Sequence, residues 1–150
     1  MAFVFRFQQI LQICLHEENE VKGRLAKKDG QIAETNALIK KYKSEYAEAL
    51  EQKIIDLQAG NMLKLQMYPA YLMRLQRSWE YQEEEQERLE KQRQKILEEL
   101  IEKRKNRKTY EKMRENDEAC YKKELLKKEQ KRLDEYANRK KQNHGEADHA

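Results

Sequence analysis

Residues that break helices, and long apolar runs, are nearly absent from this sequence. One Pro and four Gly occur among 150 residues, which is too few for a chain rich in turns. No apolar run approaches the roughly 20 residues that a membrane-spanning helix needs. The two cysteines, Cys14 and Cys120, are isolated, so they do not suggest a disulfide framework. The N-terminus, MAFVFRFQQILQICL, lacks both a basic leading stretch and a small-residue cleavage site. We therefore expect a cytoplasmic protein without a signal peptide.

Charged residues are abundant, and they are unevenly distributed. They make up 40% of the chain and give a net charge of +4, with a mean hydropathy of −1.20. Residues 1–60 hold nine basic and nine acidic side chains, whereas residues 101–141 hold sixteen basic and nine acidic ones. The apolar residues are sufficient for a narrow seam between helices, although they are too few for a globular core.

Apolar residues recur at steps of three and four from Phe7 to Ala49, which is the pattern of a coiled coil. Of the thirteen seam positions in this register, only Glu18, Lys28 and Thr35 are not apolar. After Tyr46 the pattern is expected to continue through Leu50, Ile54 and Leu57, with a stutter that locally relaxes the supercoil. A second, sparser periodic segment runs from Tyr71 to Tyr136.

A reversal separates the two periodic segments. Gly60 can close a helix in the left-handed conformation, and Pro69 suits the first turn of a helix. The predicted fold class is all-α, an antiparallel two-helix coiled-coil hairpin with a longer second helix. Helix one is expected at about 5–59, the reversal at 59–68 and helix two at about 69–141. This single domain of residues 1–141 is followed by a disordered tail, 142–150. A helix that starts near Asn61 and kinks at Pro69 is the alternative.

The expected lengths leave the end of helix two without a partner. Helix one would span roughly 80 Å and helix two roughly 105–110 Å, so that about 25 Å would project. In this region Leu133 and Tyr136 are apolar at helical spacing, among interleaved basic and acidic residues. Such an end can dock against another protein, with the mixed charges contributing orientation and specificity. A solvated helix face is the simpler interpretation.

The sequence lacks the usual motifs of catalysis and of metal binding. It has no glycine-rich phosphate loop, no HExxH and no Cys-x-x-Cys. The carboxylates of EEEQE at 83–87 are expected on a solvated helix face without a water-excluding pocket. We therefore predict no enzyme, no cofactor and no metal. KRKNRK at 103–108 leaves a nucleic-acid-binding coiled coil as an alternative, although acidic residues interrupt the helix beyond it.

Three stretches resemble the FliJ family of bacterial flagellar type III protein export. FRFQQIL at 5–11 resembles its N-terminal pattern, and YPAYLMRL at 68–75 resembles the start of its second helix. The most specific match is YEKMRE at 110–115 followed by KEQKRLDEYANR at 128–139. Pro69 and the tail after Gln142 depart from the family pattern.

The resemblance implies a non-enzymatic stalk that is peripherally associated with the inner face of the cell membrane. It implies three kinds of partner, namely the hexameric export ATPase, an export-gate membrane protein and export chaperones. Together with Leu133 and Tyr136, the positions expected to face the ATPase ring are Phe5, Phe7, Gln130, Lys131, Asp134, Glu135 and Arg139. Those expected to face the gate are Ile39, Tyr42, Tyr46, Tyr71 and Leu75. The corresponding stalk of a virulence injectisome, and homodimerisation through the unpaired seam, remain alternatives.

Overall fold

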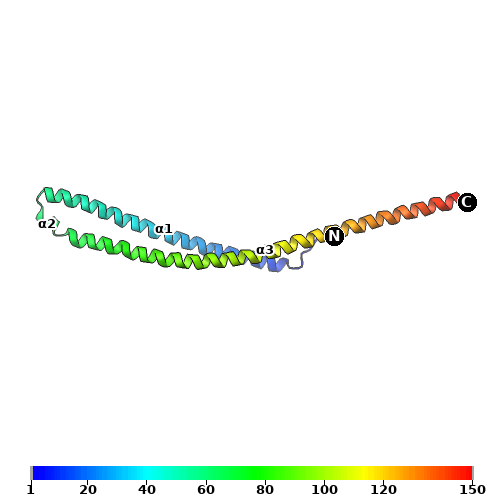
Figure 1. Ribbon diagram of the computed structural model, residues 1–150, viewed down its shortest axis with the longest axis horizontal. Coiled ribbons are helices and arrows are strands. Elements are labelled where there is room, and N and C mark those ends of the chain that lie inside the picture. Colours follow the sequence, from blue (N-terminus) through cyan, green and yellow to red (C-terminus); the bar gives the residue numbers. More distant parts are fainter. Residues whose placement is uncertain (1, 150) are drawn as a thin grey trace. The chain divides into compact units, whose positions relative to one another are not determined.

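A computed structural model describes residues 2–149, and it describes side chains for residues 2–145. The chain forms α1 (Gln8–Gln58), the single-turn α2 (Met62–Leu65) and α3 (Tyr68–His149). At about 1.5 Å per residue, α1 is about 77 Å long and α3 about 123 Å. The prediction of an all-α antiparallel hairpin with a longer second helix is confirmed (Figure 1). None of the helices described is both long and apolar enough to cross a bilayer.

The chain divides into two compact units. Unit 1 comprises residues 1–16 and 103–150, and unit 2 comprises residues 17–102. In unit 2, α1 and the first part of α3 lie side by side and are joined by the turn that contains α2 (Figure 1). The single domain expected over residues 1–141 stays a prediction, and each unit is described separately.

The predicted seam of α1 is the buried face of unit 2. Val21, Ile39 and Ala49 are buried on α1, and the buried apolar residues of α3 in this unit include Leu75 and Leu89. Two of the polar residues at seam positions, Glu18 and Thr35, are also buried. The third, Lys28, donates a hydrogen bond of 2.7 Å from Nζ to Oε1 of Gln92 across the seam. The heptad spacing therefore determines which side chains are covered even where the residue is polar.

Cross-helix polar contacts show one antiparallel register throughout unit 2. Ion pairs join Arg24 to Glu99 at 2.7 Å, Asp29 to Arg93 at 2.5 Å and Lys43 to Glu83 at 3.2 Å. Nearer the turn, the rings of Tyr46 and Trp79 meet edge to face with centroids 5.0 Å apart. The partner number on α3 falls as the number on α1 rises, as an antiparallel pair requires. Exposed ion pairs of this kind contribute little stability individually, so the apolar seam dominates.

The predicted stutter after Tyr46 is wrong, as the end of α1 shows. Leu50, Ile54 and Leu57 were expected in the seam, but they are 39%, 57% and 63% exposed. The undisturbed register instead buries Ala49 and Asp56. Asp56 can occupy a buried position because its carboxylate accepts hydrogen bonds from the side chains of two other residues, which are Gln52 and Tyr68. Seam geometry, with a partner for the carboxylate, therefore prevails over side-chain hydrophobicity here.

Gly60 closes α1 as the sequence predicts. Its φ is +71°, the left-handed conformation that glycine adopts without strain. The Asn61 N–H then donates to the Asp56 carbonyl at 3.1 Å. The Asn61 side chain in turn caps α2 by accepting from the Lys64 N–H at 3.5 Å. The reversal thus lies within 59–67, and Pro69 is in the first turn of α3.

In unit 1, aromatic residues of the N-terminal segment pack on α3. The ring centroids of Phe3 and Tyr121 are 5.5 Å apart, and those of Phe7 and Tyr110 are 6.3 Å apart. Phe5 is only 5% exposed and meets Phe7 edge to face. Helix α1 begins at Gln8 rather than near residue 5. A non-helical course in residues 2–5 accompanies these aromatic contacts, and aromatic residues favour helix less than Ala or Leu.

From Lys122 to Gly145, where side chains are described, α3 has no packed face within unit 1. Every side chain described from Lys122 to Gly145 is exposed, and we call residues 122–145 the free segment. At about 1.5 Å per residue it is roughly 36 Å long, compared with the 25 Å expected. About 6 Å of the difference comes from residues 142–145, which were predicted to belong to a disordered tail but lie within α3, since α3 continues to His149. Glu, Ala and Asp in this stretch are compatible with a helix, and Gly145 costs only about 1 kcal/mol relative to Ala.

Candidate functional site

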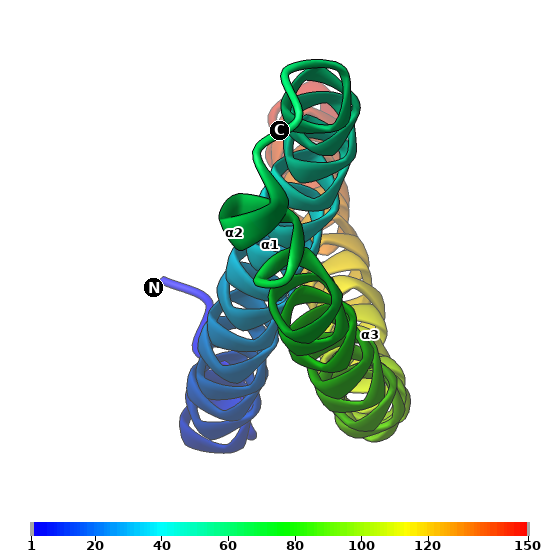
Figure 2. The ribbon, with the colours of Figure 1, turned by 90° about the vertical axis from the view of Figure 1, so that its left-hand side faces the viewer.

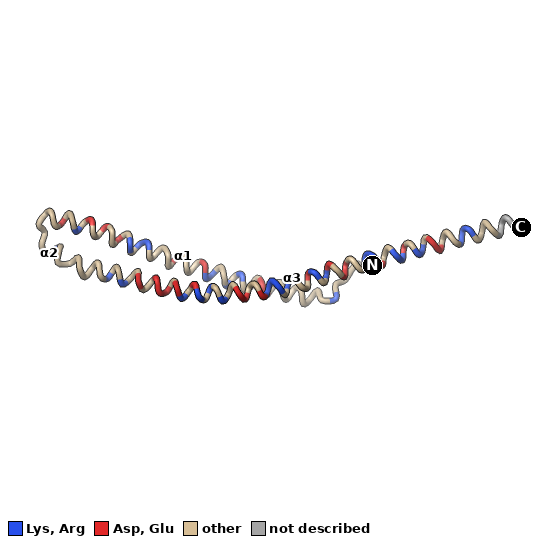
Figure 3. The backbone as a smooth tube through the Cα atoms, viewed as in Figure 1, with Lys and Arg blue, Asp and Glu red and all other residues tan. Residues whose placement is uncertain are grey.

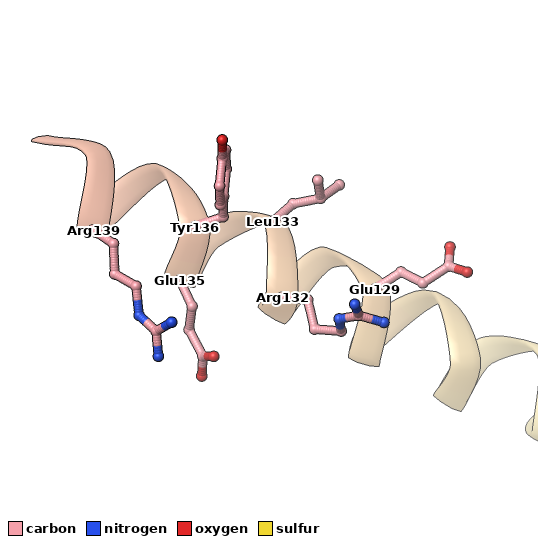
Figure 4. Close-up of a pocket in the computed structure, with 6 residues that line it drawn as sticks. All are labelled: Glu129, Arg132, Leu133, Glu135, Tyr136 and Arg139. Carbon is pink, nitrogen blue, oxygen red and sulfur yellow. The ribbon is translucent and has the colours of Figure 1, made fainter.

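An apolar stripe runs along the free segment, with its members seven and three residues apart. We define the C-terminal stripe as Leu126, Leu133 and Tyr136, which are 65%, 64% and 65% exposed. Figure 4 shows Leu133 and Tyr136 projecting to the same side of α3, with Glu135 and Arg139 on the opposite side of the view. Side chains from residues 129 to 139 surround an open depression of about 550 Å³. Because one helix alone forms it, the depression can be closed only by another surface.

Charged and polar groups flank the stripe and restrain each other only weakly. Gln130 donates a hydrogen bond to Asp134 at 3.3 Å, one helical turn away. The Lys140 ammonium lies 5.9 Å from the centroid of the Tyr136 ring. All of the predicted ring-facing residues of the free segment are exposed, namely Gln130, Lys131, Leu133, Asp134, Glu135, Tyr136 and Arg139. The structure therefore places these seven on one accessible stretch of helix.

Phe5 and Phe7 are not part of this stretch. They pack within the N-terminal segment and against Tyr110, and this segment reaches Tyr121 through Phe3. Leu133 lies roughly 18 Å further along α3, at about 1.5 Å per residue. The two halves of the predicted ring-facing set are therefore separate. Phe5 is buried in unit 1 instead of presenting a surface, and Phe3 and Phe7 make the ring contacts with α3.

The predicted gate-facing set also divides. Ile39 and Leu75 are 7% and 5% exposed and belong to the seam. Tyr46 is half-buried and covers Trp79. Only Tyr71, at 41% exposed, and the half-buried Tyr42 present surface. A sequence with apolar residues at heptad spacing does not distinguish a seam position from a partner-binding position.

Tyr42 lines an open groove of about 620 Å³ in unit 2. The rest of the lining comes from α3 and includes Met73, Arg77 and Tyr81. Tyr81 is 64% exposed and lies off the seam register, and sequence reasoning missed it. Its signal was an aromatic residue at a solvent-facing heptad position, where packing within the hairpin gives it no role.

A second group surrounds the turn of unit 2, and apart from Tyr71 sequence reasoning assigned none of its members to a partner. Its members are large apolar side chains between residues 54 and 73 that are 41–79% exposed. We define the turn-end patch as Ile54, Ile55, Leu57, Met62, Leu63, Met67, Tyr71 and Met73. Figure 3 shows this end of unit 2 with few charged residues, in contrast to the rest of the unit. Its sequence signal was a nearly uncharged stretch in a chain that is 40% charged.

Comparison with known proteins supplies the family. Neither curated proteins nor solved structures gave a match. A family model described as Flagellar FliJ protein matches residues 3–146, which is nearly the whole chain. The match covers the N-terminal segment, both long helices and the C-terminal stripe. The chain is therefore a coiled-coil protein of flagellar protein export and belongs to the FliJ family.

Proposed function

We propose that this protein is a non-enzymatic stalk whose free segment docks into the ring of the hexameric flagellar export ATPase and promotes its assembly and turnover. Family membership supports a role in flagellar export. The observation that carries the proposal is the free segment itself, in which every described side chain is exposed, including those of Leu126, Leu133 and Tyr136. An apolar stripe without an intramolecular partner provides a surface for a second protein.

The proposed docking uses two kinds of contact. Leu133 and Tyr136 bury apolar surface against the wall of the ring, and a central aromatic residue of this kind is a common hot spot. Lys131, Asp134 and Arg139 pair with charges on the ring and set the orientation of the helix. Nucleotide hydrolysis takes place in the ATPase, and the stalk biases the ring by contacting its subunits unequally.

We assign the other end of the hairpin to the export gate. Tyr42, Tyr71 and Tyr81 are the aromatic residues accessible there, and aromatic residues are enriched in interfaces. In this proposal the stalk lies on the cytoplasmic side of the membrane, where it links the ATPase to the gate and to export chaperones. The family match favours the flagellar system over a virulence injectisome.

The test is stimulation of the purified flagellar export ATPase by the full-length chain. Replacing Leu133 and Tyr136 together by Ser should reduce stimulation at least about tenfold, because two hot-spot side chains each contribute roughly 1–2 kcal/mol or more. The matched control replaces Met62 and Leu63, which are at least as exposed as Leu133 and Tyr136, by Ser. This control should stimulate as the unchanged chain does.

Circular dichroism of both variants should show unchanged helicity, since neither pair is packed. Full stimulation by the Leu133→Ser, Tyr136→Ser variant would refute docking through the C-terminal stripe. Equal loss in the control would point to a general effect of reduced surface hydrophobicity and would count equally against the assignment.

A further inference from the structure

Tyr71 of the turn-end patch is also assigned to the export gate, whereas the other seven side chains are exposed and have no part in either proposed docking contact. The eight side chains of the patch come from the end of α1, from α2 and from the start of α3, and Figure 2 looks at this end of the molecule. Contiguous exposed apolar side chains on this scale mark an interaction site. We propose that the turn-end patch inserts into the interfacial region of an anionic phospholipid bilayer.

The distribution of the apolar side chains favours lipid over a protein groove. On α1, Ile54 and Leu57 share one side, whereas Ile55 projects about 100° away from Ile54. On α3, Tyr71 and Met73 are likewise separated by about 200° of helix rotation. A helix that fits a protein groove presents a single apolar stripe. Apolar side chains all round a helix end instead suit an apolar medium that surrounds it.

The charges at this end fit an anionic surface. Residues 52–79 contain four basic side chains, Lys53, Lys64, Arg74 and Arg77, and one acidic side chain, Asp56. Asp56 is buried and accepts a hydrogen bond from the Tyr68 hydroxyl, so its carboxylate is directed away from the exterior. Among the described residues, none of the four basic side chains forms an ion pair. Basic residues beside an apolar insertion are the pattern that binds anionic headgroups.

Most backbone N–H groups of the turn are hydrogen-bonded within the protein, which suits a medium with little water. Bonds within the turn satisfy the N–H groups of residues 59–62 and 64–67, among them Ala59 to the Ile55 carbonyl at 3.0 Å and Met67 to the Lys64 carbonyl at 3.1 Å. Unsatisfied backbone groups are the main cost of placing an irregular turn at a membrane. This turn avoids most of that cost. Single-turn α2 thereby presents Met62 and Leu63, which are 69% and 79% exposed.

The experiment separates insertion of the turn from adsorption of the basic free segment. The full-length chain carrying Leu63→Trp is mixed with vesicles of phosphatidylcholine containing phosphatidylglycerol, and the control carries Leu126→Trp. Trp79 is present in both and provides the same background. We expect a blue shift of emission, and quenching by lipids brominated in the acyl chains, at position 63 but not at position 126. Pure phosphatidylcholine vesicles should give a smaller signal.

A second variant measures the contribution of the patch to binding. Replacing Met62 and Leu63 by Asp should weaken vesicle binding at least about tenfold, because the two lost apolar side chains together remove more than about 1.4 kcal/mol of transfer free energy. Replacing Leu133 and Tyr136 by Ser should leave vesicle binding unchanged, so this test is independent of the proposed ATPase docking.

Three outcomes would overturn the proposal. The first is vesicle binding without acyl-chain quenching at position 63, which would indicate adsorption through the basic segment. The second is no binding to anionic vesicles. The third is sedimentation that shows dimers of the unchanged chain but monomers of the Met62→Asp, Leu63→Asp variant, which would identify a second copy as the occupant of the patch.

Discussion

The same substitution, leucine to alanine, should have opposite consequences at two positions of α3. Leu89 is 5% exposed and lies in the seam of unit 2, whereas Leu133 is 64% exposed in the free segment. Replacing Leu89 removes about 1.5–3 kcal/mol of apolar transfer free energy and leaves a cavity. We expect a loss of about 2–4 kcal/mol, a large share of the 5–15 kcal/mol typical of a folded domain.

At Leu133 the same change removes little buried surface and leaves no cavity. Alanine is also at least as good a helix former as leucine, so the free energy of unfolding should change by less than about 0.5 kcal/mol. In thermal unfolding followed by circular dichroism, Leu89→Ala should lower the midpoint by on the order of 10 °C. Leu133→Ala should leave it within experimental error. ATPase stimulation should show the reverse order, with Leu133→Ala the more affected.

Urea unfolding at two protein concentrations completes the test. If Leu133→Ala destabilised the chain as much as Leu89→Ala, the free segment would have a packed partner. A loss that appeared only at the higher concentration would identify that partner as a second copy of the chain. Either result would refute the inference that the stripe is available to another protein.

Two further predictions concern the turn. The hydrogen bond to the Asp56 carboxylate raises the pKa of Tyr68 above its usual value near 10. The stabilisation from this hydrogen bond is complete at lower pH and is lost as the pH rises through the raised pKa. The Tyr68→Phe variant should therefore be less stable than the unchanged chain at pH 8, and the difference in stability should shrink in alkaline urea titrations. A pH-independent difference would refute this account. Gly60→Ala should cost about 1 kcal/mol because φ there is +71°. Gly30 lies in the middle of α1, and no neighbour lies within 4 Å of the Cβ that alanine would add, so Gly30→Ala should stabilise by about 0.5–1 kcal/mol in the same urea assay. Effects of the same sign would contradict the assigned backbone conformations.

The sequence predicted the seam well because the heptad period is a geometric property of the backbone. It correctly assigned Glu18, Lys28 and Thr35 to seam positions although none of them is apolar. It was wrong at Leu50 and Ile54, where hydrophobicity suggested a stutter that the helix does not make. At that point the buried position belongs to Asp56, and its partner Tyr68 is identified only once the turn is closed.

The candidate sites were predicted less completely than the fold. Leu133 and Tyr136 were identified because the expected lengths of the two helices leave this part of the second helix without a partner, and both residues are exposed in the structure. Ile39 and Leu75 were expected to face a partner, but they fill the seam, since periodicity alone assigns a position to a face and does not say what covers that face. Phe5 was similarly expected at an interface, but it is buried in unit 1. Local sequence could not show how residues 2–7 pack on a distant part of α3.

The closure at Gly60 and Asn61 has a consequence for the opposite end of the chain. Both arms begin from this one tight bend, so neither can slide along the other by a heptad without opening it. The number of residues on each side of the bend then determines which turn of α3 meets the N-terminal segment, and therefore how many turns lie beyond the contact of Phe3 with Tyr121. A change of seven residues in one arm alone would alter that protrusion by about 10 Å, whereas matched changes in both would preserve it. The position of the bend therefore sets how far Tyr136 lies beyond the contact between the N-terminal segment and α3.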